Sequence, residues 1–230
     1  MAILEIFDVN QPCLRAKCQK VTRITPSEKK LLDDMIETMR AANGIGLAAP
    51  QVGVTRRLLV VEVEEDLFAL INPEILDLSH ETEIMEEGCL SLPNYYGPVE
   101  RSVRTTVRAQ DRTGKKIRIK AEGLLARVLQ HEIDHLDGVL FFDPSRMRSL
   151  DDLHYSPPKQ EGTEADETDG EGADKQEAEA AAVPSGSNGH AAISLDERNA
   201  GSHPLHAEIH SLSEIQLTAE PFAEPVAGTL

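Results

Sequence analysis

The sequence predicts an α+β domain in which mixed or antiparallel strands pack around a C-terminal helix. Helical patterns stand at the two ends of residues 1–150, and strand patterns lie between them without the alternation that indicates a parallel sheet. After residue 150 the composition changes. We therefore expect a folded domain over residues 1–150 and a mostly disordered acidic tail over residues 151–230.

The first helix is predicted from its capping residues. Thr25 suits the N-cap, Pro26 suits the first helical position, and Glu28 completes a capping box. Apolar residues then recur at helical spacing, at Leu31, Leu32, Met35, Ile36 and Met39. The helix should end near Asn43 and Gly44, since these residue types favour termination.

Strand patterns follow the first helix. The β-branched run 58–63 and the apolar residues 67–71 are typical of strands. Residues 103–109 and 115–120 alternate between apolar and polar, and they flank an Asp-Arg-Thr-Gly turn at residues 111–114. This arrangement predicts a β-hairpin.

The last helix begins near Glu122 and should stop near Gly138. It places His131 and His135 on one face, because residues four apart lie one turn apart. Two such imidazoles can hold one divalent cation, and Glu132 can then reach a water on that cation. The pattern predicts a metal-dependent hydrolase.

The third metal ligand is expected upstream of this helix. A metzincin protease would have a histidine where this chain has Phe141, and a thermolysin-type protease would need a helix downstream, where the acidic tail begins. Cys89, which follows a glycine and precedes Pro93 by four residues, is the best candidate. The alternative is that Cys89 is simply a small buried side chain.

Three short motifs occur in a fixed order. They are Gly-Ile-Gly-Leu-Ala-Ala-Pro-Gln at residues 44–51, Glu-Gly-Cys-Leu-Ser at 87–91 and Gln-His-Glu-Ile-Asp-His at 130–135. Together they resemble the motifs of the peptide deformylase family, over about residues 1–147. The resemblance does not extend to the tail.

The resemblance implies a role for each motif. Cys89, His131 and His135 would hold one divalent metal ion, with Fe²⁺ favoured and Zn²⁺, Ni²⁺ or Co²⁺ as alternatives that the same ligand set accepts. Glu132 would act as the general base. The Gln51 side-chain amide and the Leu90 backbone N–H would donate hydrogen bonds to the formyl oxygen.

The resemblance also implies how the peptide is held. Main-chain groups of Ile45 and Gly46 would pair with an extended peptide, and Ile45, Leu124, Val128 and His131 would line a slot for methionine. Ordinary core packing is the alternative for Leu124 and Val128. Glu87 and Arg101 match an ion pair that braces the cysteine loop in the family. Two positions depart from its pattern: Tyr96 stands near a common arginine, and Arg127 is expected at the pocket rim.

The implied function is removal of the formyl group from N-terminal formyl-methionine of nascent polypeptides, with release of formate. The enzyme would be a metal-dependent amidohydrolase acting on a linear amide, in protein biosynthesis, near the ribosomal exit tunnel. Two alternatives remain open at this point. One is a metalloendopeptidase that uses the same helix, and the other is a silent copy that serves as a binding module.

Composition restricts the location and the partners. The net charge is −3 over residues 1–150 and −14 over residues 151–230, which make up the total of −17. This balance argues against sequence-specific nucleic-acid binding. Three cysteines do not make a disulfide framework, and the sequence shows neither a signal or transit peptide nor an apolar run that would span a membrane. We expect a cytoplasmic protein.

Overall fold

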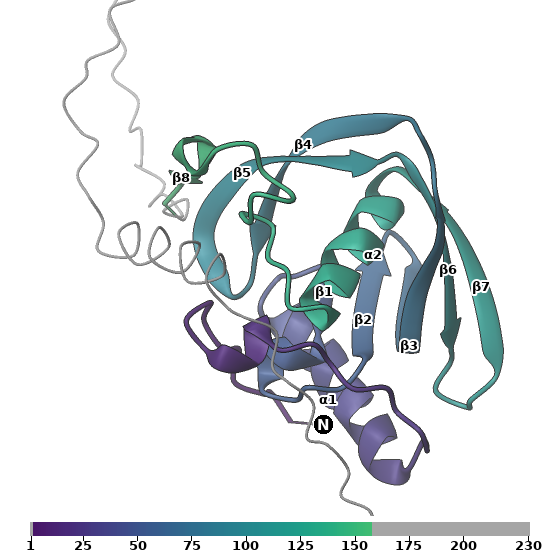
Figure 1. Ribbon diagram of the computed structural model, residues 1–230. Coiled ribbons are helices and arrows are strands. Elements are labelled where there is room, and N and C mark those ends of the chain that lie inside the picture. The colour runs from purple at the N-terminus through teal and green to yellow at the C-terminus, as the bar shows by residue number, and fades with distance from the viewer. Residues whose placement is uncertain (1, 158–230) are drawn as a thin grey trace, which may run out of the picture.

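The computed structural model describes residues 2–157 as two antiparallel β-sheets with helix α2 (Gly123–Leu136) between them and helix α1 (Pro26–Ala41) outside the larger sheet (Figure 1). This architecture confirms the predicted α+β class. The larger sheet has the order β1-β2-β3-β6-β7, and the smaller one has the order β4-β5-β8. Both β1 and β4 are therefore edge strands.

The strand bounds are Gly46–Ala48 (β1), Leu58–Val63 (β2), Asp66–Leu78 (β3), Thr82–Cys89 (β4), Leu92–Ser102 (β5), Arg104–Gln110 (β6), Lys116–Glu122 (β7) and His154–Tyr155 (β8). Short 3₁₀ helices lie at Pro12–Arg15 (η1), Ala49–Val52 (η2) and Leu150–Asp152 (η3).

Helix α1 forms as its capping residues predict. The Thr25 side chain accepts a hydrogen bond from Ser27 N, and Glu28 Oε2 accepts one from Thr25 N at 2.9 Å. The apolar stripe of the helix packs on one face of the larger sheet, in a core cluster that includes Leu32, Met35, Met39, Leu58, Val60 and Ile71. The helix ends before Asn43, which adopts a φ of 54°.

Helix α2 is buried along most of its length. Its apolar face packs on the other side of the larger sheet, in a cluster that includes Ala126, Leu129, Ile133 and Leu136. The helix ends at Leu136, two residues before Gly138, whose φ is +77°. A Cβ at this position would meet the backbone of Arg15 at 2.5 Å, so both the conformation and the space favour glycine.

The strands fall partly where the sequence places them. The β6–β7 hairpin and its turn form as expected, and Asp111 Oδ1 accepts hydrogen bonds from Thr113 N and Lys115 N. Strand β3 continues well past the predicted residue 71, to Leu78. The β4–β5 hairpin was not predicted, because most of β4 is exposed and its apolar and polar residues do not alternate.

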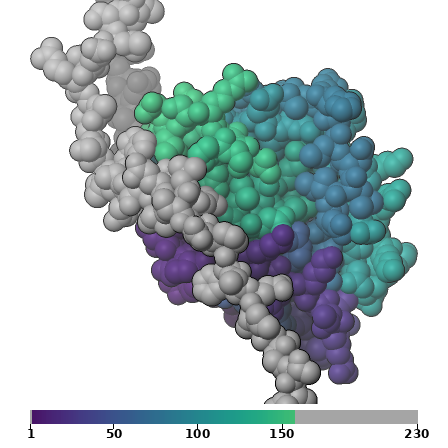
Figure 2. Space-filling view, viewed as in Figure 1, coloured from purple at the N-terminus to yellow at the C-terminus, as the bar shows by residue number. Residues whose placement is uncertain are grey.

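The segment after α2 closes the fold against the N-terminal residues. Figure 2 shows this segment, in green, next to the N-terminal part, in purple. Arg15 Nη1 donates to both carboxylate oxygens of Asp143 at 2.8 Å. Leu153 is buried in a second core cluster with Tyr95, Phe141 and Met147, so packing continues slightly beyond residue 150.

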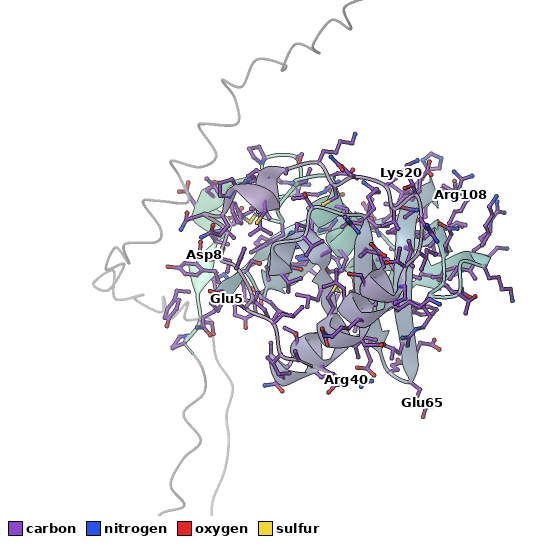
Figure 3. All side chains as sticks on the ribbon, turned by 90° about the horizontal axis from the view of Figure 1, so that it is seen from below. Glu5, Asp8, Lys20, Arg40, Glu65 and Arg108 are labelled. Atoms are coloured by element: carbon purple, nitrogen blue, oxygen red, sulfur yellow. The ribbon has the colours of Figure 1, made fainter. Side chains whose placement is uncertain are left out.

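The predicted disorder of the tail concerns mainly residues 158–230, which lie outside the described residues. Within residues 2–157, no helix is long and apolar enough to cross a membrane. The labelled side chains in Figure 3, Glu5, Asp8, Lys20, Arg40, Glu65 and Arg108, lie at the periphery of the fold. A different set of charged groups is buried beside α2, and that set belongs to the candidate site.

Candidate active site

A cavity of about 600 Å³ opens between the two sheets, and α2 forms one of its walls. The edge strands β1 and β4 both contribute to its lining, so unpaired strand edges face the cavity from two sides. Most of the residues singled out in the sequence line it, namely Ile45, Gly46, Gln51, Cys89, Leu90, Leu124, Val128, His131 and Glu132. A second cavity, of about 460 Å³, contains none of these residues.

Three potential metal ligands meet beside this cavity. One ligand atom from each of Cys89, His131 and His135 lies within 4.8 Å of the other two. Cys89 Sγ lies 3.3 Å from His135 Nε2. Cys89 is the last residue of β4, and the two histidines stand one turn apart on α2, so a strand end and a helix face converge. A set of one thiolate and two imidazoles suits a transition-metal ion, and the residues present therefore fit such an ion.

Glu87 orients the first histidine. Glu87 Oε2 accepts a hydrogen bond from His131 Nδ1 at 2.9 Å, which leaves the other ring nitrogen of His131 for a ligand. Arg101 binds the same carboxylate through Nε at 2.6 Å and Nη2 at 2.8 Å, as the resemblance implied. Burial alone would raise the pKa of Glu87. The hydrogen bonds from His131 and Arg101 outweigh burial and hold that pKa far below its usual value.

Arg127 lines the cavity, but it is buried and not exposed at the rim as predicted. Its side chain is buried and donates to Glu87 Oε1 at 2.8 Å and to the carbonyl oxygens of Val99 and Glu83. The reason is that Glu87 needs several donors once it is buried, and Arg127 stands one turn before His131 on α2. Arg127 is therefore part of the support for the metal site.

Asp134 and Arg146 extend this network, and neither was singled out in the sequence. Asp134 Oδ2 accepts from Arg101 Nη1 at 2.7 Å, and Arg146 binds both oxygens of Asp134 at 2.6 Å. Asp134 could have been noticed, since it lies inside the Gln-His-Glu-Ile-Asp-His motif three residues after His131. Arg146 lies beyond every motif, so nothing local marked it.

Glu132 is buried beside the ligands. Its Oε2 atom has no hydrogen-bond partner among the residues that the structure describes, and the side chain lines the cavity. Burial raises the pKa of Glu132 to about 7, although His131 and Arg101 favour its charged form. A carboxylate with a raised pKa and a free oxygen at a cavity wall is suited to accept and return a proton.

Gln51 presents its amide nitrogen to the site. Its Oε1 atom accepts from Ala48 N at 2.7 Å, and this contact determines which way the amide points. The Nε2 atom consequently faces Cys89 Sγ at 3.5 Å and Ser91 Oγ at 3.3 Å. Leu90 lies between these two residues, in the turn that joins β4 to β5. Two potential hydrogen-bond donors thus stand beside the candidate ligands.

Phe141, which stands where a metzincin protease would have its third histidine ligand, has a different role here. Its ring stacks on the ring of His131, with 6.1 Å between the centroids and 25° between the planes. The side chain therefore supports the His131 ring by an aromatic contact. The third candidate ligand, Cys89, comes instead from the end of β4, upstream of α2.

Comparison with known proteins agrees with this geometry. The family model for polypeptide deformylase matches residues 3–151. The chain belongs to the polypeptide deformylase family. It is 52% identical over 145 residues to the peptide deformylase of Halothermothrix orenii, covering 62% of this chain and 94% of that one. It is 53% identical over 148 residues to that of Thermodesulfovibrio yellowstonii, covering 62% and 89%.

Solved deformylase structures have the same fold. The structure from Thermotoga maritima aligns with a TM-score of 0.62 and 44% identity, covering 64% of this chain and 99% of that one. The structure from Synechococcus elongatus in complex with actinonin aligns with a TM-score of 0.60 and 42% identity, covering 62% and 79%. The family function is metal-dependent deformylation of nascent peptides, so the enzymatic activity predicted from the sequence is confirmed.

Proposed function

We propose that Cys89, His131 and His135 hold one divalent metal ion, with Fe²⁺ as the first candidate, and that the cavity beside them binds the formyl-methionyl end of a nascent peptide. The observation that carries the proposal is the convergence of the three ligand atoms within 4.8 Å beside that cavity. When bound, the ion would supply Lewis acidity, which makes water a nucleophile near neutral pH.

Residues of this chain transfer the proton of the attacking water and stabilise the negative charge that develops on the formyl oxygen. Glu132 accepts the proton from the attacking water, whose oxygen bonds to the formyl carbon. Glu132 then passes that proton to the amine nitrogen as the C–N bond breaks, and formate and a free amino terminus result. The Gln51 side-chain amide and the Leu90 backbone N–H donate to the formyl oxygen as it gains charge. One such donor is typically worth about 10²–10³ in rate.

The cavity walls support a peptide substrate. Gly46 begins the edge strand β1 and Ile45 directly precedes it, and an extended peptide can add as a strand along the free edge of β1. Val128 is buried and Leu124 is half exposed, one turn apart on α2, and together with Ile45 and His131 they form an apolar wall for a methionine side chain. Such a slot would favour unbranched apolar residues next to the formyl group.

The place of action follows from the substrate. Formylated amino termini occur on chains that are being synthesised, so we place the enzyme in the cytoplasm, near the ribosomal exit tunnel. We assign catalysis to residues 1–150 and no catalytic role to the acidic tail, 151–230. Truncation after Pro157 should then leave deformylation unchanged, while co-sedimentation with ribosomes reports separately whether the tail contributes to a ribosome contact.

The proposal is tested with protein purified without oxygen in the presence of iron. Elemental analysis gives the metal content, and formate release from formyl-Met-Ala-Ser gives the activity. We expect about one metal ion per chain and rapid formate release. Loss of activity on chelation should be reversed by Fe²⁺, Ni²⁺, Co²⁺ or Zn²⁺ to different extents. A metal-loaded protein that releases no formate would contradict the proposal, and cleavage of internal bonds in unformylated peptides would favour an endopeptidase.

A further inference from the structure

Strand β8 pairs with β5 on the side away from β4. Tyr155 stands opposite Tyr95, and His154 stands opposite Tyr96. The next backbone N–H, that of Ser156, donates to the carbonyl oxygen of Asn94 at 2.8 Å. Residues 154–156, which are β8 and the residue after it, therefore contact residues 94–96 of β5.

The β5 residues that β8 contacts are at an irregularity in the strand. Cys89 of β4 pairs with Leu92, whereas the preceding residue, Gly88, pairs with Tyr96. Residues 93–95 consequently have no opposite residue on β4, and Asn94 adopts a φ of +67°. A bulge of this kind loses ladder hydrogen bonds and needs other partners to hold one conformation. Strand β8 supplies such partners.

The same bulge forms a wall of the substrate cavity. Asn94, Tyr95 and Tyr96 line the cavity, as does Glu86 on the adjoining strand. The bulge begins beside Cys89. The conformation of the bulge therefore affects both the cavity wall and the position of Cys89. Ordering a flexible wall when a peptide binds would cost free energy. This wall lacks strand partners on one side, so it binds a peptide tightly only if other contacts hold its conformation before the peptide arrives.

Side chains reinforce the backbone contacts. Leu153, which is 4% exposed, packs with Tyr95 in the second core cluster. The rings of Tyr155 and Tyr95 lie 5.4 Å apart at 60°. His154 Nε2 lies 3.3 Å from Glu86 Oε1, so the strand also contacts β4 across the bulge. These contacts connect residues 153–156 to both strands of the wall.

We propose that residues 153–156 are a brace that holds the 93–96 wall of the cavity and thereby determines the affinity for peptide residues beyond the formyl-methionine. The inference rests on the proposed function only in that the cavity holds the peptide. The family match ends at residue 151, so the brace lies outside the matched region. These are positioning residues, since none of them is placed at the reacting atoms.

The test removes one brace contact in the full-length, metal-loaded enzyme. Ser156→Pro deletes the N–H that donates to Asn94, and Pro is compatible with the extended residue before it. Ser156→Ala keeps that N–H and is the matched control. Kinetics are measured with formyl-Met-Ala-Ser, which reaches beyond the first residue, and with formyl-methionine, which does not.

We expect Ser156→Pro to raise KM for formyl-Met-Ala-Ser by about five- to tenfold with kcat within about twofold, because it removes uniform binding energy and no transition-state contact. Its kcat/KM for formyl-methionine should change by less than about twofold, and Ser156→Ala should behave like the wild type. Amide hydrogen exchange in residues 94–97 should speed up in Ser156→Pro alone.

Several results would overturn the brace. They are an unchanged KM for the tripeptide, an equal loss of kcat/KM with both substrates, or unaltered amide hydrogen exchange in residues 94–97. If Ser156→Pro does not fold, Tyr155→Ala with Tyr155→Phe as its control applies the same test through the ring contact with Tyr95. A wild-type enzyme that releases no formate would refute the proposed function, and the exchange measurement would still decide whether the brace holds the wall.

Discussion

Gly46 lies so close to Glu132 that a Cβ at position 46 would overlap the Glu132 carboxylate. It would also come within 2.9 Å of Val128 Cγ1. The edge of β1 and the face of α2 therefore touch at the point where the proposed substrate backbone and the proposed general base must both fit. The second glycine of the first motif is therefore required by its packing against Glu132 and Val128 of α2, whatever its proposed role in admitting a peptide.

Gly46→Ala should lower kcat/KM by about 10²-fold or more, because moving a catalytic carboxylate by even 1 Å has effects of that size. The metal content should stay unchanged. Gly44→Ala is the comparison within the same loop, since a Cβ there meets the movable tip of Leu90. Formate release with parallel elemental analysis measures both. Equal losses in the two variants would mean that the contact with Glu132 is not the cause.

Glu132→Gln should retain the metal and lose about 10²–10⁴ in kcat, since an amide is isosteric but cannot accept the proton. Glu122→Gln, at the exposed start of the same helix, is the control and should retain activity. Single-turnover formate release and metal analysis are the measurements. Turnover close to that of the wild type would remove Glu132 from the role of base.

Glu87→Ala should destabilise the fold and the metal site together. It leaves Arg127 buried without its carboxylate and Arg101 with Asp134 alone, and removal of one partner of a buried ion pair typically costs about 3–5 kcal/mol of unfolding free energy. Loss of the hydrogen bond to His131 should weaken metal binding by about 10–100-fold. Urea unfolding and metal competition test both effects. Glu83→Ala, an exposed position on the same strand, should change neither.

The stabilising contribution of Glu28 to the folded state should be lost in acid. Its hydrogen bonds with Thr25 lower its pKa from the usual 4.5, so its carboxylate stabilises the folded state above that pH. This contribution is lost as the pH falls below about 4.5 and through the lowered folded-state value. We expect the unfolding free energy of the wild type to exceed that of Glu28→Gln by roughly 0.3–1 kcal/mol at pH 7, and this difference should become smaller towards pH 3. A constant gap in urea unfolding across this range would contradict the role of the charge.

Elements with local causes could be predicted from the sequence. The capping box of Thr25 and Glu28, the apolar stripe of α2 and the Asp-Arg-Thr-Gly turn all act within a few residues. Strand β4 could not be predicted, because its Thr-Glu-Ile-Met-Glu-Glu run shows no one-sided burial pattern. Strands β1 and β8 are too short to show any periodicity, and they exist only because a longer strand lies beside each of them.

The candidate site divides in the same way. The sequence by itself determined the helix face with His131 and His135, because their spacing matches a helical turn, and the three motifs identified the family. The resemblance also implied the ion pair of Glu87 and Arg101. Only the tertiary structure decided that Arg127 would be buried on Glu87, that Arg146 would bind Asp134, and that β8 would support the wall of the cavity. A helical turn depends on hydrogen bonds between near neighbours. These other contacts join residues far apart in the chain and form only when both sheets have packed around α2.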